Sequence, residues 1–560
     1  MDRSSEYNII KSLLIKRSKS DIGPPPYRFR PIRFDSNSKL EWTDYSWEQV
    51  YQNVKNASLG IRKIGLKKKS PRIALISEQS TDALEMLFTA WSIGSELYPV
   101  DPKSSIKESV ELLKNNHIEL VAIENNNDID RLNAYLRKFK IELPELKFVM
   151  SFSDTAYRDP EGVRFEILRM SQIRDAGLAC PDIERNQFQE WIEALDLSET
   201  ALHFATPQKP KAFSHEAMLA ALNQLPNQLK GGINSKKNHD ITFASFSLGT
   251  TIGILQMLAP LVTPLTLCFT NGEPSPIDLK EIQPTSYWLG RVPLEKAVKT
   301  ELIYDIIGSR FRALFVFTEE PYQIDERIVR ANRYSITSMI MVKNAFGPVA
   351  CRRHEIDKDA NSFGTLTDGF SIRQIDGELY IKSAQLCESS ADSSEWTQNG
   401  YWNTRFKGGV NSDGVIHADA PGDFFILRQK LERAARDFDL IEDFVMSTQH
   451  PYSAILTVSV EGAIRFTGRH QIDLPSEHSQ IVESPSILHE VELIVDSINQ
   501  LLSGEKKLVR VTVLPGRLDY ARHDFNPIGS PRFAAIQARC RASKSGLDSR
   551  TGSGIFLHHG

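Results

Sequence analysis

Between residues 73 and 123, short apolar runs alternate with longer stretches of helical periodicity. The runs at 73–76, 97–100 and 120–123 are predominantly apolar and have the length of a buried strand. Between them, residues 83–93 and 106–115 place apolar side chains three and four positions apart, as one face of a helix does. Strands separated by helices of this length imply parallel strands joined by crossovers. The pattern therefore predicts an α/β fold.

A further helix is expected just before this region. From Trp47 to Ile61, apolar residues recur at helical spacing. Ser46 is suited to cap the first turn, and Gly65 to end the helix. Residues 1–40 contain a Gly-Pro-Pro-Pro run and no sustained period, so they are expected to form a leader on the surface.

The composition excludes several classes of protein. A chain of 560 residues with 41% apolar and 25% charged residues has the composition of an ordinary globular protein with more than one domain. Its 67 basic and 71 acidic residues leave a net charge of −4. Such a balance gives no overall field to hold a nucleic acid or an anionic membrane. Nucleic acid is therefore not an expected partner.

The sequence also bears on location. The N-terminus lacks the charged start and apolar run of a secretory signal. The longest apolar stretch, residues 241–269, is interrupted by Ser, Gly, Thr and two prolines, so no membrane span is expected. The five cysteines are far apart and have no partner at metal-binding spacing, which is typical of free thiols in a reducing compartment. These observations predict a cytoplasmic protein without a metal site.

Several segments along the chain follow one another in a recognisable order. They are 45–50 (YSWEQV), 72–75 (RIAL), 94–102 (GSELYPVDP), 344–348 (NAFGP), 376–381 (DGELYI), 400–402 (GYW), 413–414 (DG) and 450–452 (HPY). In their order and spacing they resemble the adenylate-forming superfamily. This superfamily includes acyl- and aryl-CoA ligases, the adenylation domains of nonribosomal peptide synthetases, and luciferases. The resemblance covers about residues 40 to 540.

The resemblance implies a particular domain organisation. A large N-terminal domain of layered sheets and helices with a distorted β-barrel would be followed by a small, mobile α+β domain. Residues 41–420 are expected to form the large domain and 421–541 the small one, with 1–40 as the leader and 542–560 as a flexible tail. The Pro-Gly pair at 421–422 favours an irregular junction about which the small domain would rotate.

Three elements are expected inside the small domain. Two apolar runs on either side of Glu461-Gly462 predict a hairpin over residues 455–466. Residues 488–502 predict an amphipathic helix, and residues 509–514 predict a strand.

The chemistry of the resembled family makes specific demands on the sequence. Adenylation joins a carboxylate to ATP and releases pyrophosphate, so the site must hold two anions in contact. The family uses a Ser/Thr/Gly-rich loop ending in Pro-Lys, because glycine lets backbone N–H groups approach the phosphates. The matching residues 203–211 keep Thr206 and Lys211 but contain no glycine. The resemblance places Thr206 and Lys211 at the nucleotide, whereas the missing glycines favour an ordinary basic surface loop.

Two further nucleotide-binding segments are altered. Phe346 and Gly347 match the start of the family's aromatic-Gly-x-Thr-Glu segment, in which the ring lies by the adenine and the glutamate carries Mg²⁺. Phe346 is expected as a wall of that pocket or as a core aromatic. Val349 and Ala350 replace the Thr and Glu, and alanine offers Mg²⁺ no oxygen ligand. Phe406 stands where the family has the aspartate that binds the ribose.

Charged residues of the family's motifs are also replaced at the domain junction and near the C-terminus. In the family's Gly-Arg-x-x-Asp hinge segment, Pro421 replaces the arginine and Leu427 the following lysine, which leaves Asp423 as the remaining hinge residue. Near the C-terminus, Ser530 occupies the place of the lysine that bridges carboxylate and phosphate, with Arg532 close by in the sequence.

Taken together, these changes predict a protein on the adenylate-forming scaffold that is impaired in adenylation. It would bind a carboxylic acid, an acyl ligand, a nucleotide, or a partner such as a carrier protein, and no cofactor is assigned to it. The alternative is an active divergent acyl- or aryl-CoA or acyl-AMP ligase. Such a ligase would need ATP and Mg²⁺ and would use Lys209, Lys211 or Arg532 as cations. A third interpretation is a structural partner subunit that binds no small ligand.

Overall fold

The computed structural model describes a large part of the 560 residues. The described residues are 8–11, 23–30, 41–66, 70–155, 157, 165–204, 211–229, 239–270, 274–291, 293–294, 297, 308, 310–319, 321, 334–342, 344–359, 361–387, 396, 399–418, 428, 431–432, 434–435, 437–446, 453–470, 484–500, 508, 510–514, 518, 536 and 555–558. Three predicted site residues, Thr206, Asp423 and Ser530, lie outside them, as does the predicted junction at 421–422.

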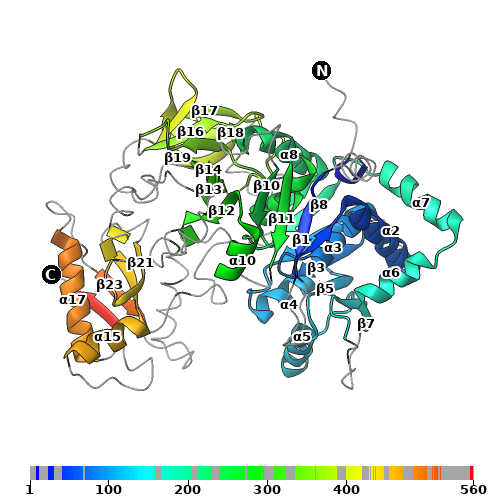
Figure 1. The fold of residues 1–560 in the computed structure, drawn as a ribbon, viewed down its shortest axis with the longest axis horizontal. Helices are drawn as coiled ribbons and strands as arrows, with labels where there is room; N and C mark the ends of the chain where they lie inside the picture. The colour runs from blue at the N-terminus through cyan, green and yellow to red at the C-terminus, as the bar shows by residue number, and fades with distance from the viewer. Residues whose placement is uncertain are drawn as a thin grey trace.

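A seven-stranded sheet carries the α/β pattern in the N-terminal part of the chain (Figure 1). Its strand order is β7-β6-β5-β3-β4-β8-β9, and neighbouring strands are parallel except β8 and β9. The strands are β3 (Arg72–Ile76), β4 (Glu96–Val100), β5 (Leu120–Ile123), β6 (Phe148–Ser151), β7 (Glu166–Arg169), β8 (Thr200–Phe204) and β9 (Lys211–Ser214). The crossover helices are α3 (Thr81–Ser92), α4 (Ile106–Asn115) and α5 (Asn126–Phe139). The parallel strands and crossover helices predicted between residues 73 and 123 are confirmed.

Helix α2 (Trp47–Lys63) begins and ends as its sequence predicts. The Ser46 hydroxyl accepts a hydrogen bond from the Gln49 amide, and the Gln49 side chain accepts one from the Ser46 amide. This reciprocal pair is a capping box, which satisfies two backbone donors at the helix start. Gly65 follows the helix with a φ of +102°, a conformation that side chains other than glycine rarely adopt.

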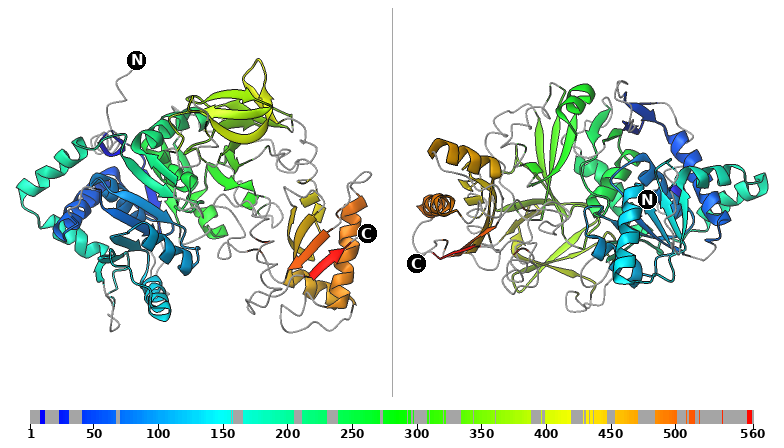
Figure 2. Two further views of the ribbon diagram at one scale, coloured as in Figure 1. Left: turned by 180° about the vertical axis from the view of Figure 1, so that it is seen from behind. Right: turned by 90° about the horizontal axis from the view of Figure 1, so that it is seen from below.

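Helix α2 packs directly against α6 (Met170–Leu178). A Cβ on Gly60 would lie 2.0 Å from a carbonyl oxygen of α6, and one on Gly177 would lie 1.8 Å from a carbonyl oxygen of α2. The two backbones are therefore in contact, and only glycine fits at these positions. Figure 2 shows α6 and the following α7 (Asp182–Glu193) at the edge of the N-terminal part.

A four-stranded sheet of order β10-β11-β1-β2 lies next along the fold. Its strands are β1 (Tyr27–Phe29), β2 (Thr43–Tyr45), β10 (Asp240–Phe243) and β11 (Leu265–Phe269), with the helices α8 (His215–Leu229), α9 (Thr251–Leu258), α10 (Pro276–Ile282) and the 3₁₀ helix η3 (Ala259–Leu261) nearby in the chain. Tyr27, in the segment expected to be a surface leader, is fully buried, and its hydroxyl donates to Met257 O at 2.9 Å. Among the described residues, no helix is long and apolar enough to cross a membrane.

A nine-stranded sheet forms the middle of the molecule, in the order β12-β13-β14-β15-β16-β20-β19-β18-β17. The first three strands are parallel and the others pair antiparallel. The strands are β12 (Ser286–Gly290), β13 (Ala313–Thr318), β14 (Ser335–Ile340), β15 (Ala350–Arg353), β16 (Ser362–Leu366), β17 (Ser371–Ile375), β18 (Glu378–Lys382), β19 (Trp402–Val410) and β20 (Val415–Ala418). This sheet positions the candidate site.

The C-terminal part has its own sheet and its own hydrophobic core (Figure 1). Its strand order is β21-β22-β23-β24. The elements are β21 (Ile441–Met446), β22 (Ser453–Val458), α15 (Val460–His470), α17 (Pro485–Gln500), β23 (Arg510–Leu514) and β24 (Ile555–His558). The helix predicted at 488–502 is confirmed as α17 as far as Gln500, and the strand predicted at 509–514 is confirmed as β23 from Arg510. Residues 501, 502 and 509 lie outside the described residues.

The hairpin predicted for residues 455–466 is wrong, because β22 is followed by helix α15. Gly462 is not a turn residue. A Cβ there would lie 2.0 Å from Asp439 O, so the glycine allows α15 to pack against the chain before β21. Residues 555–558, in the segment expected to be a flexible tail, form β24, which pairs antiparallel with β23.

A buried polar cluster joins β2 and the helices α2, α3 and α6. Glu85 is 2% exposed and accepts hydrogen bonds from the Tyr45 hydroxyl and from Asn53 Nδ2. Arg174 Nη1 lies 2.7 Å from Glu85 Oε2 and 3.2 Å from Asp82 Oδ1. Burial, and then the nearby charge of Glu85, raises the pKa of Asp82 to about 6.

This pKa predicts a pH-dependent effect of Asp82→Asn. A carboxyl group whose pKa is raised by folding binds more protons in the folded state, so its contribution to stability is lost as pH rises from about 4 to about 6. Asparagine does not titrate. The stability of the variant relative to the wild type should therefore rise by about 1–2 kcal/mol between pH 4 and pH 7.5, as urea unfolding at both values would measure. Glu111→Gln, at an exposed position, is the control, and an equal rise there would contradict the assignment to Asp82.

Candidate functional site

Residues 346–350 follow β14, at the edge where the parallel strands β12, β13 and β14 end. In open α/β sheets, ligands bind at this carboxyl edge. Phe346 is fully buried, and its ring packs edge-on against Phe213 of β9, with centroids 5.5 Å apart. Its amide donates to Gln385 O at 2.9 Å. Of the two roles expected for Phe346, this packing favours the core aromatic.

Gly347 is held between a helix and a loop. A Cβ at this position would lie 3.2 Å from Ala221 Cβ of α8 and 2.8 Å from Gln385 Oε1. The contact with α8 leaves little room for a side chain. A side chain here would make Ala221 and the Gln385 side chain shift, so glycine suits this close approach of the chain to α8, whether or not a ligand approaches.

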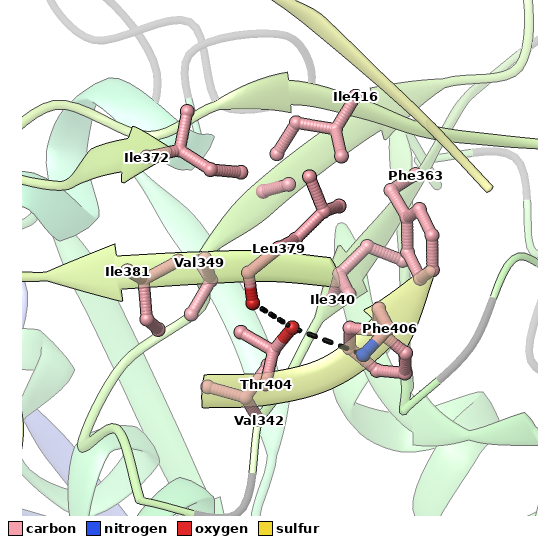
Figure 3. Close-up of a pocket in the computed structure, with 11 residues that line it drawn as sticks. Ile340, Val342, Val349, Phe363, Ile372, Leu379, Ile381, Thr404, Phe406 and Ile416 are labelled. Carbon is pink, nitrogen blue, oxygen red and sulfur yellow. Dashed lines mark hydrogen bonds between the residues drawn. The ribbon is translucent and has the colours of Figure 1, made fainter. Parts of the chain in front are cut away.

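Val349, Ala350 and Phe406, the three replacements noted in the sequence, border one apolar cavity (Figure 3). It lies among β14, β15, β16, β18, β19, β20 and β17 and measures about 20 Å³, enough for about one water molecule. Val349 and Ala350 are buried, and the Phe406 ring packs on Phe363 with centroids 4.8 Å apart. The other lining residues are Ile340, Val342, Ile372, Leu379, Ile381, Thr404 and Ile416.

Thr404 carries the one polar side chain in this lining. Its hydroxyl donates to Leu379 O at 2.7 Å and accepts a hydrogen bond from the Phe406 amide at 3.2 Å (Figure 3). The hydroxyl therefore serves the pairing of β18 with β19. A water molecule needs two to four polar partners to be held in a cavity, so this lining suits apolar atoms.

The cavity residues do not fit Mg²⁺. The ion takes oxygen ligands in near-octahedral geometry, and the side chains of Val349, Ala350 and Phe406 carry no oxygen. Among the residues that the structure describes, no group of three or more His, Cys, Asp or Glu side chains is placed to hold a metal ion.

Lys211 lies apart from this cavity. It begins β9 and faces Phe204 of β8 in the antiparallel register. The structure thus brings together the three replaced positions, and Phe346 and Gly347 lie shortly before two of them, Val349 and Ala350, in the chain. Lys211 is not in the cavity lining. Thr206, Asp423 and Ser530 lie outside the described residues, so their predicted places remain predictions.

A serine–histidine pair joins β14 to the residue that directly follows β15. Ser338 Oγ lies 2.7 Å from His354 Nε2, and both side chains are buried. Burial, reinforced by the charges of Arg352 and Lys358, lowers the pKa of His354 to about 3. The imidazole is therefore neutral at physiological pH. Because Ser338 is fully buried, the pair has no route to a substrate and acts as a structural hydrogen bond.

Sequence reasoning did not identify most of the cavity lining. Ile340, Phe363, Leu379 and Ile416 come from four different strands and have no motif in common. One sequence signal could have identified part of the lining. Buried and more exposed residues alternate along β18, with Leu379 and Ile381 buried and Glu378 and Lys382 more exposed.

Solved structures with similar architecture were found. The adenylation domain of carboxylic acid reductase from Segniliparus rugosus, solved in complex with AMP and a co-purified carboxylic acid, matches with a TM-score of 0.70 and 14% identity over 95% of this chain and 93% of that chain. The adenylation domain of a carboxylate reductase from Mycobacterium chelonae gives 0.69 and 12% over 95% and 90%. The O-succinylbenzoate coenzyme A synthetase of Bacillus subtilis, in complex with AMP, gives 0.63 and 12% over 97% and 99%. By sequence, the chain matches no family profile and no curated protein.

These similarities define the fold. The chain has the α/β fold of adenylate-forming enzymes along nearly its whole length. The predicted α/β fold class is thereby confirmed, and the resemblance to the adenylate-forming superfamily is confirmed at the level of the fold. At identities of 12–14%, the likeness concerns architecture, and the AMP and the carboxylic acid belong to the proteins that contain them.

Proposed function

We propose that this protein is a homologue of adenylate-forming ligases in which adenylation is impaired and which binds an acyl compound or a partner protein. One observation carries the proposal. The positions that would supply threonine, glutamate and aspartate to the nucleotide are Val349, Ala350 and Phe406, and they meet at one cavity with an apolar lining. Val349 and Ala350 lie in one segment and Phe406 in another, so two separate segments place apolar side chains at the same space.

The chemical consequence is large. Adenylation needs cations and hydrogen-bond donors around the phosphates and ligands for Mg²⁺. Each lost contact of this type costs about 2–4 kcal/mol of transition-state stabilisation. Such losses are not additive, but two of them slow turnover by several orders of magnitude.

An active divergent ligase is the second candidate, and the comparisons favour it in one respect. Structures that match most of this chain include adenylation domains solved with AMP, one of them with a co-purified carboxylic acid. In this alternative Lys209, Lys211 or Arg532 would supply the missing cations, with ATP and Mg²⁺ as cofactors. A structural subunit without a small ligand is the third candidate.

The proposal includes the class of ligand and the organisation of the chain. A carboxylic acid, an acyl ligand or a carrier protein is the proposed partner, and one structural neighbour is an A-PCP didomain. The division at about residue 420 into a large and a small domain is part of the proposal, supported by the separate core of the C-terminal part. A cytoplasmic location is proposed because Cys180, Cys268, Cys351 and Cys387 are free thiols.

Pyrophosphate release with ATP, Mg²⁺ and a panel of carboxylic acids tests the proposal. We expect no release above background from the wild type or from Ser530→Lys, since one restored lysine cannot act unless the phosphates are held in line beneath it. Thermal shift with the same acids, without ATP, tests the binding function separately. Robust release by the wild type would favour the active ligase, and neither release nor an acid-dependent shift would favour the structural subunit.

A further inference from the structure

A buried ion pair joins the middle of the molecule to its C-terminal part. Arg291 Nη1 lies 3.1 Å from Glu432 Oε2, and the two side chains are 3% and 4% exposed. The residues are separated by 141 positions in the sequence. Charged side chains are rarely buried to this extent, and they remain so only when each has a partner.

Glu432 belongs to the C-terminal part. Its neighbours Leu431 and Ala435 pack in the same hydrophobic core as β21, β22 and α17. Its Oε1 atom accepts a hydrogen bond from the Met446 amide at 3.3 Å and lies 3.6 Å from Arg428 Nε. Contacts within the C-terminal part therefore orient the Glu432 carboxylate independently of Arg291.

Arg291 lies at the end of a strand of the nine-stranded sheet. It directly follows Gly290, the last residue of β12, and Leu294 three positions later packs in the core that covers one face of β12 and β13. The arginine therefore lies directly after β12, at the carboxyl edge where β13 and β14 also end.

We propose that Arg291 and Glu432 form a latch that fixes the C-terminal part, which comprises the described residues between 428 and 514 and β24, in one orientation against the end of β12. Both side chains are almost fully buried, so moving the two parts against each other would separate a buried ion pair and deprive each charge of this partner. The ion pair is also directional. The other carboxylate oxygen, Oε1, accepts the hydrogen bond of the Met446 amide and pairs with Arg428, so Oε2 is left facing Arg291. This inference concerns orientation, and it replaces the rotation expected about residues 421–422. It does not depend on whether the protein adenylates.

Comparison with an exposed ion pair of the C-terminal part supports the role proposed for Arg291 and Glu432. Arg465 and Asp439 lie 3.6 Å apart, but their side chains are 50% and 59% exposed. Such surface pairs contribute little, since water and salt screen them. Both of these residues also lie in the same part of the chain, so their pair cannot fix one part relative to the other.

Distance measurement between the two parts tests the latch. Spin labels would be attached at two exposed residues, through Ile375→Cys on β17 and Ile464→Cys on α15, in full-length protein that carries Cys540→Ser. Double electron–electron resonance is expected to give a single narrow distance. Arg291→Met should lose that single distance and add others, because Glu432 keeps Arg428 and the Met446 amide, so the C-terminal part stays folded but is no longer held.

Arg465→Met is the matched control and should keep the single distance. Hydrogen exchange of α17 reports whether the C-terminal core is folded in each variant. Arg291→Lys retains the charge without the planar fork and should give an intermediate result. A broad distribution in the wild type, or an unchanged single distance in folded Arg291→Met, would overturn the proposal. The wild-type measurement remains decisive if a variant does not fold.

Discussion

Replacing Ala350 with glutamate is expected to lower the free energy of unfolding by more than about 3 kcal/mol, because it places an unpaired carboxylate and extra volume in an apolar cavity. Ala350 is 1% exposed, and Thr404, the polar side chain of the lining, already serves the strands on either side. Urea denaturation followed by circular dichroism measures the loss. In the resembled family, a glutamate at this position is the residue that carries Mg²⁺.

A second variant and a change of pH distinguish the effect of side-chain volume on stability from the effect of charge. Ala350→Gln adds nearly the same volume without a charge, so it should destabilise the protein less than glutamate does at pH 7. Burial would raise the pKa of the new carboxyl group, so the deficit of the glutamate variant should shrink as pH falls. A fully stable Ala350→Glu protein would mean that this position has access to water or to a cation, which contradicts an apolar site.

Phe346→Ala is expected to lower the free energy of unfolding by about 3–5 kcal/mol, the usual cost of removing a fully buried phenylalanine. The Phe346 ring packs beside Phe213, and the Phe346 amide donates a hydrogen bond to the Gln385 carbonyl. Phe346→Leu retains most of the volume and should lose clearly less. A ring that forms the open wall of a nucleotide pocket would contact fewer atoms, and its removal would cost little stability. A loss below about 1 kcal/mol for Phe346→Ala would therefore contradict its place in the core.

The elements between residues 46 and 123 could be predicted from sequence because their signals are local. Ser46 and Gln49 form their capping box within one turn, and Gly65 ends the helix through its own backbone conformation. The hairpin predicted at 455–466 failed for the opposite reason. Gly462 resembles a turn residue in the sequence. Its actual role is to let α15 pack against Asp439, which precedes β21 and is distant in the local sequence pattern.

The candidate site divides in the same way. Val349, Ala350 and Phe406 could be found one at a time by comparing ordered motifs, but their shared cavity depends on how β14 to β20 pair. Whether Phe346 is a pocket wall or a core residue depended on Phe213, which is far from it in sequence. The pair of Arg291 and Glu432 has no local signal at all, because each residue alone is an ordinary charged side chain.

Titration of the wild-type protein with Mg-ATP in a calorimeter tests the central claim most directly, because it asks for nucleotide binding without requiring a substrate acid. An adenylation domain known to bind AMP serves as the positive control. Valine, alanine and phenylalanine at positions 349, 350 and 406 offer no ligand for Mg²⁺ and no carboxylate for the ribose. We therefore predict no heat of binding above dilution. Saturable binding of Mg-ATP in the low micromolar range would contradict this account and make the active ligase the better description of the protein.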